Sequence, residues 1–335
     1  MITEIKLQYF KSFVENTIAL KDLTLLTGLN SSGKSSIMQA MRLINNTLKE
    51  NKNILLEGHG SFEEILNNFS KDKNINFEIN DSFFKKLNVN IWKDDFKVVP
   101  FNYKFPQIIY ISADRFGPRS FIPIINNYSE ELTIGSQGEN ILQFIEQYEN
   151  QELNEILRHE KSEGVNFIFN LKAWLQEISP NIKFRYEINK RSDSSFSLFN
   201  DHRSTNVGFG LSYTLPVIVA ALAGTFIKNS IILLENPEAH LHPKGQTAIS
   251  KLIALCVSAG AQIIVETHSD HLFDGIRIAV KNELISNEQV QIHWFELDSN
   301  DNTQVYSPII DKNGRLNEWP KYMFDQFEIN SSELL

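Results

Sequence analysis

The 335-residue sequence predicts an α/β fold with a mixed or parallel core sheet, antiparallel N-terminal strands and an α+β insert. Three observations lead to this class. Helical patterns alternate with short buried strands from residue 212 to residue 281, as in parallel sheets. A glycine-bearing loop near residue 30 separates a buried strand from a helix with one apolar face. Short aromatic strands lie between polar turns in residues 50–105, which indicates an irregular antiparallel sheet.

The composition is typical of a soluble globular protein, with 42% hydrophobic and 22% charged residues. A net charge of −9 gives no overall basic footprint for nucleic acid, although a local basic groove can exist in an acidic protein. Cys256 is the only cysteine, which excludes an intramolecular disulfide. The N-terminus has no apolar signal segment, and the longest apolar run, 215–227, is too short to span a membrane. We expect a cytoplasmic protein without a membrane partner.

The N-terminal half begins with predicted strands. Strand-like runs at 5–10, 17–20 and 23–27 precede the loop, and apolar residues in 35–48 recur at helical spacing. The β-rich segment 50–105 follows, and then a buried strand that ends in charge at 107–115.

The second half combines an insert with an alternating core. Helical patterns and two strands form the insert at 136–200. The alternating core then predicts a helix over 212–228, a strand over 230–235, a helix over 244–258, a strand over 261–266 and a helix over 270–281. Residues 285–335 are expected to form a C-terminal extension.

The octapeptide GLNSSGKS, residues 28–35, fits the pattern G-x-x-x-x-G-K-[ST] without a mismatch. Its glycines let backbone N–H groups turn toward phosphate oxygens, and Lys34 adds a positive charge on the terminal phosphates. The Ser35 hydroxyl can ligate Mg²⁺, and the following helix presents its positive N-terminal end. The motif therefore predicts binding of a nucleotide together with Mg²⁺.

The stretch IILLENPEAHLHP, residues 231–243, places Glu235 at the end of a predicted strand. Ligands bind beyond the carboxyl ends of such strands, so Glu235 is a candidate Mg²⁺ carboxylate; the alternative is a cap for the helix at 244. Asn236 stands where a hydrolytic base is expected, and an amide can orient water but cannot accept its proton. Glu238, two residues on and past Pro237, is the candidate base, since it could swing toward the same water.

Two further elements carry candidate residues. Gly208 and Gly210 precede an apolar helix, and Pro216 in its first turn predicts a start between Ser212 and Thr214. This second helix N-terminus is a potential anion site, with a plain tight turn as the alternative. His268 follows the strand IIVE and is a candidate for contact with a γ-phosphate or with water.

The alternating Glu238, His240 and His242 are residue types that bind transition metals. On a strand the three side chains would share one face. Pro237 and Pro243 bracket the segment and disfavour a regular strand, so we do not predict a transition-metal site there.

The order of GLNSSGKS, NVGFGLS, IILLENPEAHLHP and IIVETHSDHL resembles ABC-type ATPases. The most similar group is the stand-alone AAA-labelled ATPases related to the overcoming-lysogenization-defect (OLD) nucleases, RecF and the structural-maintenance-of-chromosomes (SMC) proteins. ISADRFGPRS and GRLNEWPKYMFD also resemble a stand-alone subfamily with an uncharacterised C-terminal domain. The resemblance implies that residues 1–335 form one ABC-type P-loop ATPase domain.

The same resemblance implies a head-to-tail homodimer that encloses two ATP molecules. It identifies Glu235 as the Walker B carboxylate, His268 as the switch histidine and His240–His242 as the D-loop. Lys11, in the motif FKSF, is implied to touch the nucleotide. The implied Walker A residues are Asn30, Ser31, Ser32, Gly33, Lys34, Ser35 and Ser36, and the implied signature residues are Gly208, Gly210 and Ser212.

The sequence departs from the family pattern in three ways. The usual Asp-Glu pair is Glu235-Asn236 here, the signature loop is degenerate, and no coiled-coil arm is present. Only 67 residues follow His268, too few for the nuclease domain of OLD proteins. Arg115 and Arg119 have no predicted functional role, and a salt-bridged core turn is the expected explanation for them.

These features predict a regulatory ATPase that dimerises around ATP and controls a separate effector in anti-phage defence or DNA maintenance. Its turnover is expected to be slow because the base is displaced. The alternative is an ATP-gated clamp on nucleic acid with little hydrolysis, against which the acidic composition counts. A transporter ATPase is disfavoured because no coupling segment is recognisable.

Overall fold

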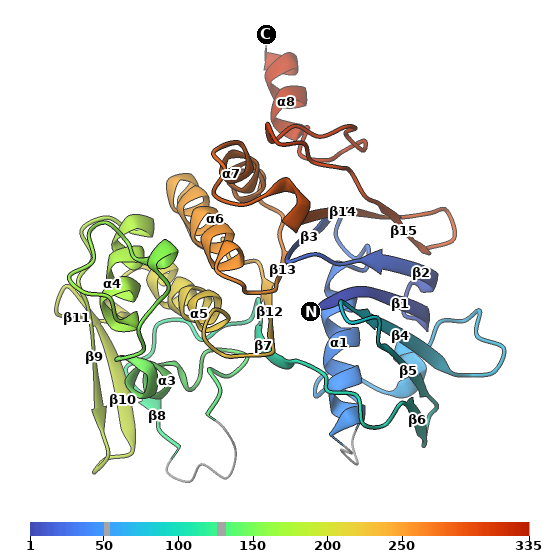
Figure 1. The fold of residues 1–335 in the computed structure, drawn as a ribbon, viewed down its shortest axis with the longest axis horizontal. Helices are drawn as coiled ribbons and strands as arrows, with labels where there is room; N and C mark the ends of the chain where they lie inside the picture. Colours follow the sequence, from blue (N-terminus) through green and yellow to red (C-terminus); the bar gives the residue numbers. More distant parts are fainter. Residues whose placement is uncertain (50–53, 126–131, 335) are drawn as a thin grey trace. The chain divides into compact units, whose positions relative to one another are not determined.

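The computed structural model describes residues 1–49, 54–125 and 132–334. The chain forms two compact units, whose elements are labelled in Figure 1. Unit 1 comprises Met1–Ile108, Glu288–Asp311 and Leu316–Leu335, and unit 2 comprises Ile109–Asn287 and Lys312–Arg315.

The predicted segments distribute between these units. The segment 50–105 falls in unit 1, although its first residues, 50–53, lie outside the described residues. The insert 136–200 falls in unit 2. Most of 285–335 belongs to unit 1, and its last residue also lies outside the described residues.

An antiparallel sheet forms one part of unit 1. Its strands are β1 (Ile2–Phe10), β2 (Phe13–Ala19), β4 (Ile75–Asp81), β5 (Lys86–Ile91) and β6 (Phe96–Val99). They lie in the order β2-β1-β4-β5-β6, and alternate residues of β4 and β5 are buried, as in strands with one face on a core. The antiparallel pairing predicted for segment 50–105 is confirmed, since β4 pairs with β5 and β5 with β6.

A second group of strands in unit 1 carries the glycine-bearing loop. These strands are β3 (Leu23–Gly28), β14 (Val290–Leu297) and β15 (Thr303–Tyr306). β3 is buried along its whole length and lies parallel to β14, which pairs antiparallel with β15. Helix α1 (Lys34–Leu48) follows the loop and buries one apolar face. The predicted order of strand, loop and helix is therefore confirmed. Unit 1 also contains α2 (Phe62–Ile65) and α8 (Gln326–Leu334).

Strands and helices alternate in unit 2, as predicted for residues 212–281. The elements are α5 (Phe209–Ala223), β12 (Ser230–Glu235), α6 (Pro243–Ser258), β13 (Ile263–Glu266) and α7 (Asp270–Lys281). β12 and β13 are parallel and in register, with Glu235 opposite Glu266, and β7 (Gln107–Ile111) lies on the other side of β12. Both acidic strand ends therefore lie at the same edge.

The predicted insert forms helices and a small antiparallel sheet. Its elements are β8 (Ile122–Pro123), α3 (Ile141–Tyr148), η1 (Glu155–Leu157), α4 (Phe167–Ile178), β9 (Phe184–Asn189), β10 (Ser194–Phe199), β11 (His202–Arg203) and η2 (Ser204–Asn206). β10 is the central strand, with antiparallel pairing to β8, β9 and β11. Helices α4, α5 and α6 pack side by side (Figure 1).

Helix α5 begins earlier than the sequence predicted. We expected a start between Ser212 and Thr214, whereas the helix begins at Phe209 and holds Pro216 in its interior. Proline lacks the N–H that would bond the carbonyl four residues earlier, here that of Ser212. Near this point the hydroxyl of Thr214 donates to the Gly210 carbonyl at 2.5 Å, which does not replace the bond that Pro216 cannot make to the Ser212 carbonyl. Burial of nearly every later residue of α5 then stabilises the helix despite the proline.

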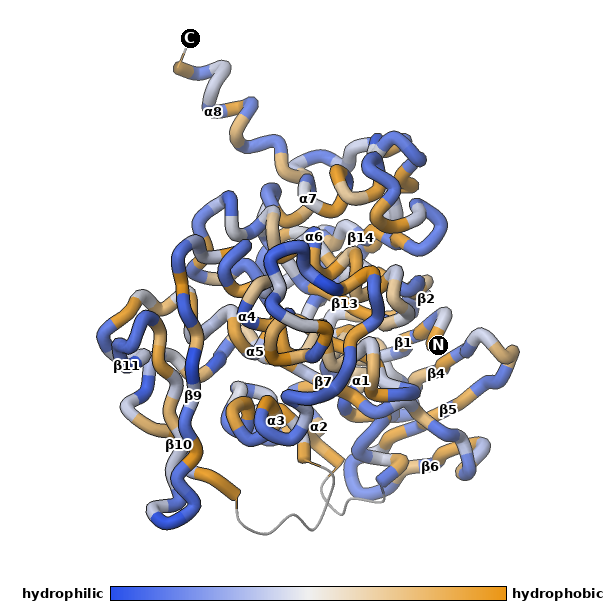
Figure 2. The backbone as a smooth tube through the Cα atoms, turned by 60° about the vertical axis from the view of Figure 1, so that its left-hand side comes forward, coloured by the Kyte–Doolittle hydropathy of each residue, from blue (hydrophilic) through white to orange (hydrophobic). Residues whose placement is uncertain are grey.

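Figure 2 shows α5 as a mostly hydrophobic stretch of the tube, which fits a helix buried on nearly all sides. The apolar stretch of α5 is too short to cross a membrane. Within the part of the chain that the structure describes, no helix is both long and apolar enough to cross a membrane.

Candidate nucleotide-binding site

The phosphate loop of unit 1 depends on two glycines with left-handed backbone. Gly28 has φ 141°, and a Cβ there would lie 2.2 Å from the carbonyl oxygen of Phe295 on β14. Gly33 has φ 104°, and a Cβ there would lie 2.7 Å from Thr303 Oγ1. Any larger residue would therefore be both strained and obstructed. The glycines of the motif are required by the close approach of β14 and β15, which local sequence does not reveal.

Lys34 lies over the loop that it follows. Its side chain is buried, and its Nζ donates to the carbonyl oxygens of Gly28 at 3.1 Å and Leu29 at 2.6 Å. Ser32 Oγ also donates to the Leu29 carbonyl, at 2.7 Å. No acidic residue stands in the first turn of α1, so its N-terminal end keeps its positive potential. The loop thus joins a fixed cation to a helix N-terminus, an arrangement suited to a polyphosphate.

The other predicted Walker A residues divide by exposure. Asn30 and Ser31 lie exposed at the tip of the loop, and Ser31 has φ 62°. Ser36 is buried, and its N–H donates to the Gly33 carbonyl at 3.0 Å. Ser35 is half-buried in the first turn of α1, where its hydroxyl can reach a metal on the phosphates.

Lys11 lies in the tight turn between β1 and β2. Its Nζ donates to Gln39 Oε1 on α1 at 2.5 Å, and burial lowers the pKa of Lys11. The backbone N–H of Lys11 donates to the Ile65 carbonyl at 2.8 Å. The structure therefore holds the predicted Lys11 against the helix of the phosphate loop. Gln39 was not singled out from the sequence.

In unit 2 the candidate residues gather at the carboxyl ends of β12 and β13. Glu235 Oε2 accepts a hydrogen bond from the Ala113 N–H at 3.0 Å, and the Asn236 N–H donates to the Glu266 carbonyl at 2.8 Å. These bonds fix the end of β12 from both sides. Asn236 has φ 43°, a left-handed conformation that asparagine tolerates better than most residues do.

Arg115 clamps the end of β12, a role that sequence analysis missed. Its Nη1 donates to the Glu235 carbonyl at 3.0 Å and its Nη2 to the Asn236 carbonyl at 2.7 Å. The guanidinium carbon lies 5.3 Å from the centre of the Tyr213 ring on α5, and burial lowers the pKa of Arg115 to about 10. The expected salt-bridged turn is wrong for this residue because its hydrogen bonds go to carbonyl oxygens. Arg119 is exposed, and its guanidinium carbon lies 3.7 Å from the centre of the Phe116 ring.

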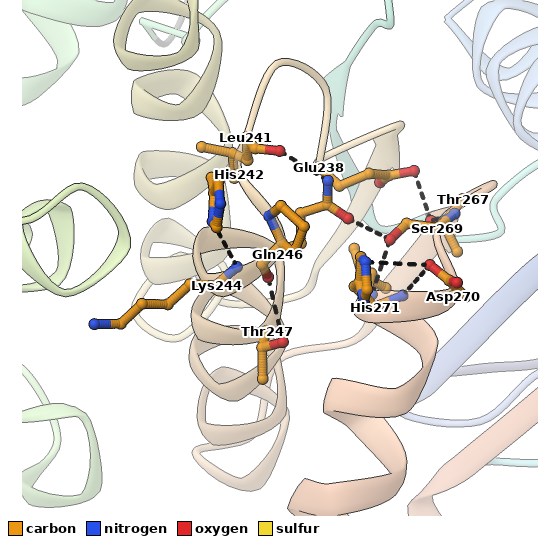
Figure 3. A network of polar contacts seen from close by, with 12 residues as sticks. Glu238, Leu241, His242, Lys244, Gln246, Thr247, Thr267, Ser269, Asp270 and His271 are labelled. Carbon is orange, nitrogen blue, oxygen red and sulfur yellow. Dashed lines mark hydrogen bonds and ion pairs between the residues drawn. The ribbon is translucent and has the colours of Figure 1, made fainter. Parts of the chain in front are cut away.

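Glu238 joins the turn after β12 to the end of β13 (Figure 3). Its Oε1 accepts from Thr267 Oγ1 at 2.7 Å and from the His268 N–H at 3.2 Å. The side chain is buried, and this burial raises the pKa of Glu238. Glu238 Oε2 and Asn236 Oδ1 are both buried without a hydrogen-bond partner among the described residues. These two oxygens, one of an amide and one of a carboxylate, thus keep hydrogen-bonding capacity for a further group.

Hydrogen bonds through α6 complete a closed ring around this turn (Figure 3). Ser269, the N-cap of α7, donates to Gln246 Oε1 at 2.5 Å, and Gln246 Nε2 donates to the Leu241 carbonyl at 2.8 Å. The Leu241 N–H returns to the Glu238 carbonyl at 3.0 Å. The positions of Glu238 and the His268 backbone are therefore coupled.

His242 caps α6, because its Nδ1 accepts the Lys244 N–H at 3.3 Å. The alternative in which Glu235 caps this helix is therefore wrong. Among the described residues, no three His, Cys, Asp or Glu side chains are grouped as a metal site.

The residues predicted to form the signature loop lie at the start of α5, beside the segment predicted to be the D-loop. Gly208 is the N-cap, so Gly210 and Ser212 belong to the first turn of the helix and not to a preceding loop. A Cβ on Gly210 would lie 2.8 Å from the His240 carbonyl, and the Tyr213 ring packs edge-on against His240 with centroids 4.6 Å apart. The start of α5 and the segment around His240 therefore form one packed block, in which the predicted signature and D-loop residues meet. Ser212 Oγ is buried without a partner among the described residues.

A loop of this geometry, leading from a buried strand into a helix, is characteristic of the P-loop class of nucleotide-binding proteins. A family model described as "AAA domain, putative AbiEii toxin, Type IV TA system" matches residues 23–274. The chain belongs to this AAA-domain family. A second model, described as "Protein of unknown function (DUF3696)", matches residues 285–334. Comparison with curated proteins gave no match.

Two solved SMC head structures share the fold. The Smc head bound to the C-winged-helix domain of ScpA aligns with a TM-score of 0.58 at 15% identity, covering 93% of this chain and 98% of that chain. The Smc head with an extended coiled coil, bound to the C-terminal domain of ScpA derived from Pyrococcus furiosus, gives a TM-score of 0.56 at 12% identity, covering 100% and 99%. RecF-ATPrS in the RecFOR pathway gives 0.46 at 13% identity, covering 91% and 98%. The fold is therefore the ABC-type ATPase fold of SMC heads, as the resemblance implied.

Proposed function

We propose that the protein is a regulatory ATPase that dimerises head to tail around two ATP molecules and controls a separate effector protein. The observation that carries this proposal is the phosphate loop, with its left-handed glycines and buried Lys34. The family description names a toxin–antitoxin system, which supports a role in anti-phage defence or DNA maintenance. Unit 1 carries the phosphate loop, and unit 2 carries the carboxylates at the ends of β12 and β13.

Magnesium is the proposed cofactor beside ATP. Mg²⁺ prefers oxygen ligands, and each unit by itself offers one candidate: the Ser35 hydroxyl in unit 1 and the Glu235 carboxylate in unit 2. The Ala113 N–H anchors Glu235 Oε2, which leaves Oε1 as the acceptor oriented by that bond. When bound, the ion would neutralise negative charge on the phosphates.

Slow hydrolysis is proposed from the groups that follow Glu235. Asn236 can orient a water molecule, and Glu238 is the proposed proton acceptor because its raised pKa makes its carboxylate more basic. Thr267 and the His268 backbone hold one oxygen of Glu238, so it must act from a fixed position. We assign contact with the γ-phosphate to His268.

The dimer is proposed from the packed block of signature and D-loop. The signature residues stand at the N-terminus of α5, where a helix end favours anions, and no acidic residue occupies its first turn. Control of an effector is supported by analogy, since two SMC heads of the same fold are bound to domains of a separate protein, ScpA.

Gly208 provides a clean test of the dimer. It has φ −63°, and a Cβ there would meet nothing within 4 Å, so Gly208→Ala and Gly208→Glu should both fold. In sedimentation with Mg²⁺-ATP, wild type and Gly208→Ala should form dimers. Gly208→Glu should bind ATP but stay monomeric, because its carboxylate would face the phosphates bound by the partner.

Three outcomes would overturn parts of the proposal. A wild-type oligomer indifferent to ATP would exclude the ATP-linked dimer, and normal dimerisation of Gly208→Glu would move the interface away from α5. Absence of phosphate release by wild type, with or without DNA, would remove hydrolysis while leaving ATP binding intact.

A further inference from the structure

We propose that Thr303, in the segment matched by the C-terminal family, is a positioning residue for the phosphate loop. The inference rests on ATP binding at that loop and deepens it. Thr303 opens β15, far in sequence from residues 28–35 and outside the AAA-matching range 23–274. Residues 285–334, which match a family of unknown function, thereby gain a role in the nucleotide site.

Thr303 is buried and forms hydrogen bonds to two segments of unit 1. Its Oγ1 donates to the Ser32 carbonyl at 2.9 Å and lies 2.7 Å from Ser12 Oγ. Its backbone N–H donates to the Ser12 carbonyl at 2.9 Å, and Asn16 Nδ2 donates to the Thr303 carbonyl at 3.3 Å. One residue therefore joins β15, the turn that carries Lys11, and the phosphate loop.

The bond to Ser32 matters because of peptide geometry. The Ser32–Gly33 peptide is planar and trans, so its carbonyl and the Gly33 N–H point in opposite directions. Holding the Ser32 carbonyl on Thr303 turns the Gly33 N–H away from β15. A phosphate loop needs its N–H groups directed inward, and each outward carbonyl then needs a donor from outside the loop. Thr303 supplies that donor.

The approach of β15 is itself fixed by the turn before it. Asp298 Oδ1 accepts the N–H groups of Asn300 at 2.8 Å and Asn302 at 2.9 Å. A Cβ on Gly33 would lie 2.7 Å from Thr303 Oγ1, so the loop and the threonine are already in close contact. Thr303 therefore acts on the loop from a rigid support.

The test compares three full-length variants. Thr303→Val keeps the shape and removes the hydroxyl, and Thr303→Ser keeps the hydroxyl. Thr24→Val is the matched control, since Thr24 is also a fully buried threonine of unit 1 and its Oγ1 bonds only the backbone of Lys21, at the far end of β3. The readouts are the Kd for Mg²⁺-ATP and the Tm without nucleotide.

We expect Thr303→Val to weaken ATP binding about 10-fold, the effect of leaving one buried carbonyl without its donor. Thr303→Ser should bind ATP like wild type, and Thr24→Val should lower Tm without changing Kd. An unchanged Kd in Thr303→Val, or an equal rise in Thr24→Val, would overturn the proposal. Wild type that fails to bind ATP would instead refute nucleotide binding itself.

If Thr303→Val fails to fold, hydrogen exchange on wild type decides the question. Addition of Mg²⁺-ATP should slow exchange at the Gly33 amide and in residues 297–306 together. Protection confined to the loop, with 297–306 unaffected, would overturn the coupling.

Discussion

The phosphate loop of unit 1 and the strand ends of unit 2 are built differently. The loop uses residues adjacent in sequence, and Lys34 and Ser32 bond carbonyls only a few positions away. The turn after β12 is held by Arg115, about 120 positions earlier, and by Thr267, 29 positions later. A short motif therefore marks the phosphate loop in the sequence, although Thr303 also holds it from far along the chain, whereas no local motif marks the groups that hold the turn after β12.

The two regions also differ in hydrogen-bond satisfaction. Asn236 Oδ1 and Glu238 Oε2 in unit 2 are buried and have no partner among the described residues. Buried polar atoms without partners are costly, and they persist where they serve another group. Changes in the loop should therefore alter ATP affinity, and changes at the strand ends should alter turnover.

The largest expected effect is on binding. Lys34→Ala should weaken ATP binding by about 100-fold or more, because a buried cation that pairs with phosphate is lost. Calorimetric titration with Mg²⁺-ATP measures the change. Lys6→Ala is the control, since Lys6 on β1 is a lysine of the same unit that pairs with Glu15 at the surface. Wild-type affinity in Lys34→Ala would refute the loop as the binding site.

Arg115→Lys should mainly reduce turnover. Lysine keeps the charge but cannot bond the Glu235 and Asn236 carbonyls in the same forked geometry. We expect kcat to fall about 10-fold or more, as for loss of a buried charged hydrogen bond, with Kd for ATP unchanged. Steady-state phosphate release measures kcat, and nucleotide titration measures the Kd for ATP. A matching Arg119→Lys should behave like wild type, and a loss of affinity in Arg115→Lys would break the division between the units.

Glu238→Gln should change the pH dependence of stability. The folded-state pKa of Glu238 lies above its unfolded value, so its stabilising effect is complete below the unfolded pKa and is lost as pH rises through the folded pKa. Glutamine still accepts from Thr267 and His268 but does not titrate. The Tm of the variant should therefore fall less than that of wild type with rising pH, and Glu187→Gln on exposed β9 serves as control. If Tm changed equally with pH in Glu238→Gln and in wild type, the raised pKa of Glu238 would be refuted.

The smallest effect is expected at Asn236. Asn236 has φ 43°, which glycine adopts without strain, so Asn236→Gly should keep the free energy of unfolding of wild type. Asn236→Glu should lower the free energy of unfolding by about 1 kcal/mol, because a left-handed backbone is unfavourable for most side chains. Urea unfolding gives both values. If Asn236→Glu also raises ATP turnover, the missing base limits the wild-type rate; equal turnover would place the limit elsewhere.

Sequence reasoning reached the elements whose signals are local. The phosphate loop, the alternating strands and helices, and the acidic ends of β12 and β13 all follow from motifs and periodicity. The start of α5 was misplaced because a proline rule for isolated helices was applied to a helix that tertiary burial stabilises. His242, not Glu235, caps α6 because an imidazole nitrogen can accept an N–H.

The contacts that sequence could not supply are those between distant residues. Arg115 looked like one arginine of a charged turn, and nothing local marks the carbonyls that it bonds. Thr303 stands among polar residues of a predicted extension, without a motif. Both become visible only when the fold brings their hydroxyl or guanidinium beside a backbone that needs a donor.

Because Gly28 packs closely against Phe295, β3 depends on the C-terminal segment, and this matters when a truncated chain is expressed. A fragment that ends at residue 284, between the two family matches, would lack β14 and β15. β3 would then present an unpaired edge of apolar residues, and such edges recruit other chains. The AAA-matching segment expressed alone should therefore aggregate, and supplying residues 285–334 on a separate polypeptide should rescue its solubility only if that piece pairs with β3.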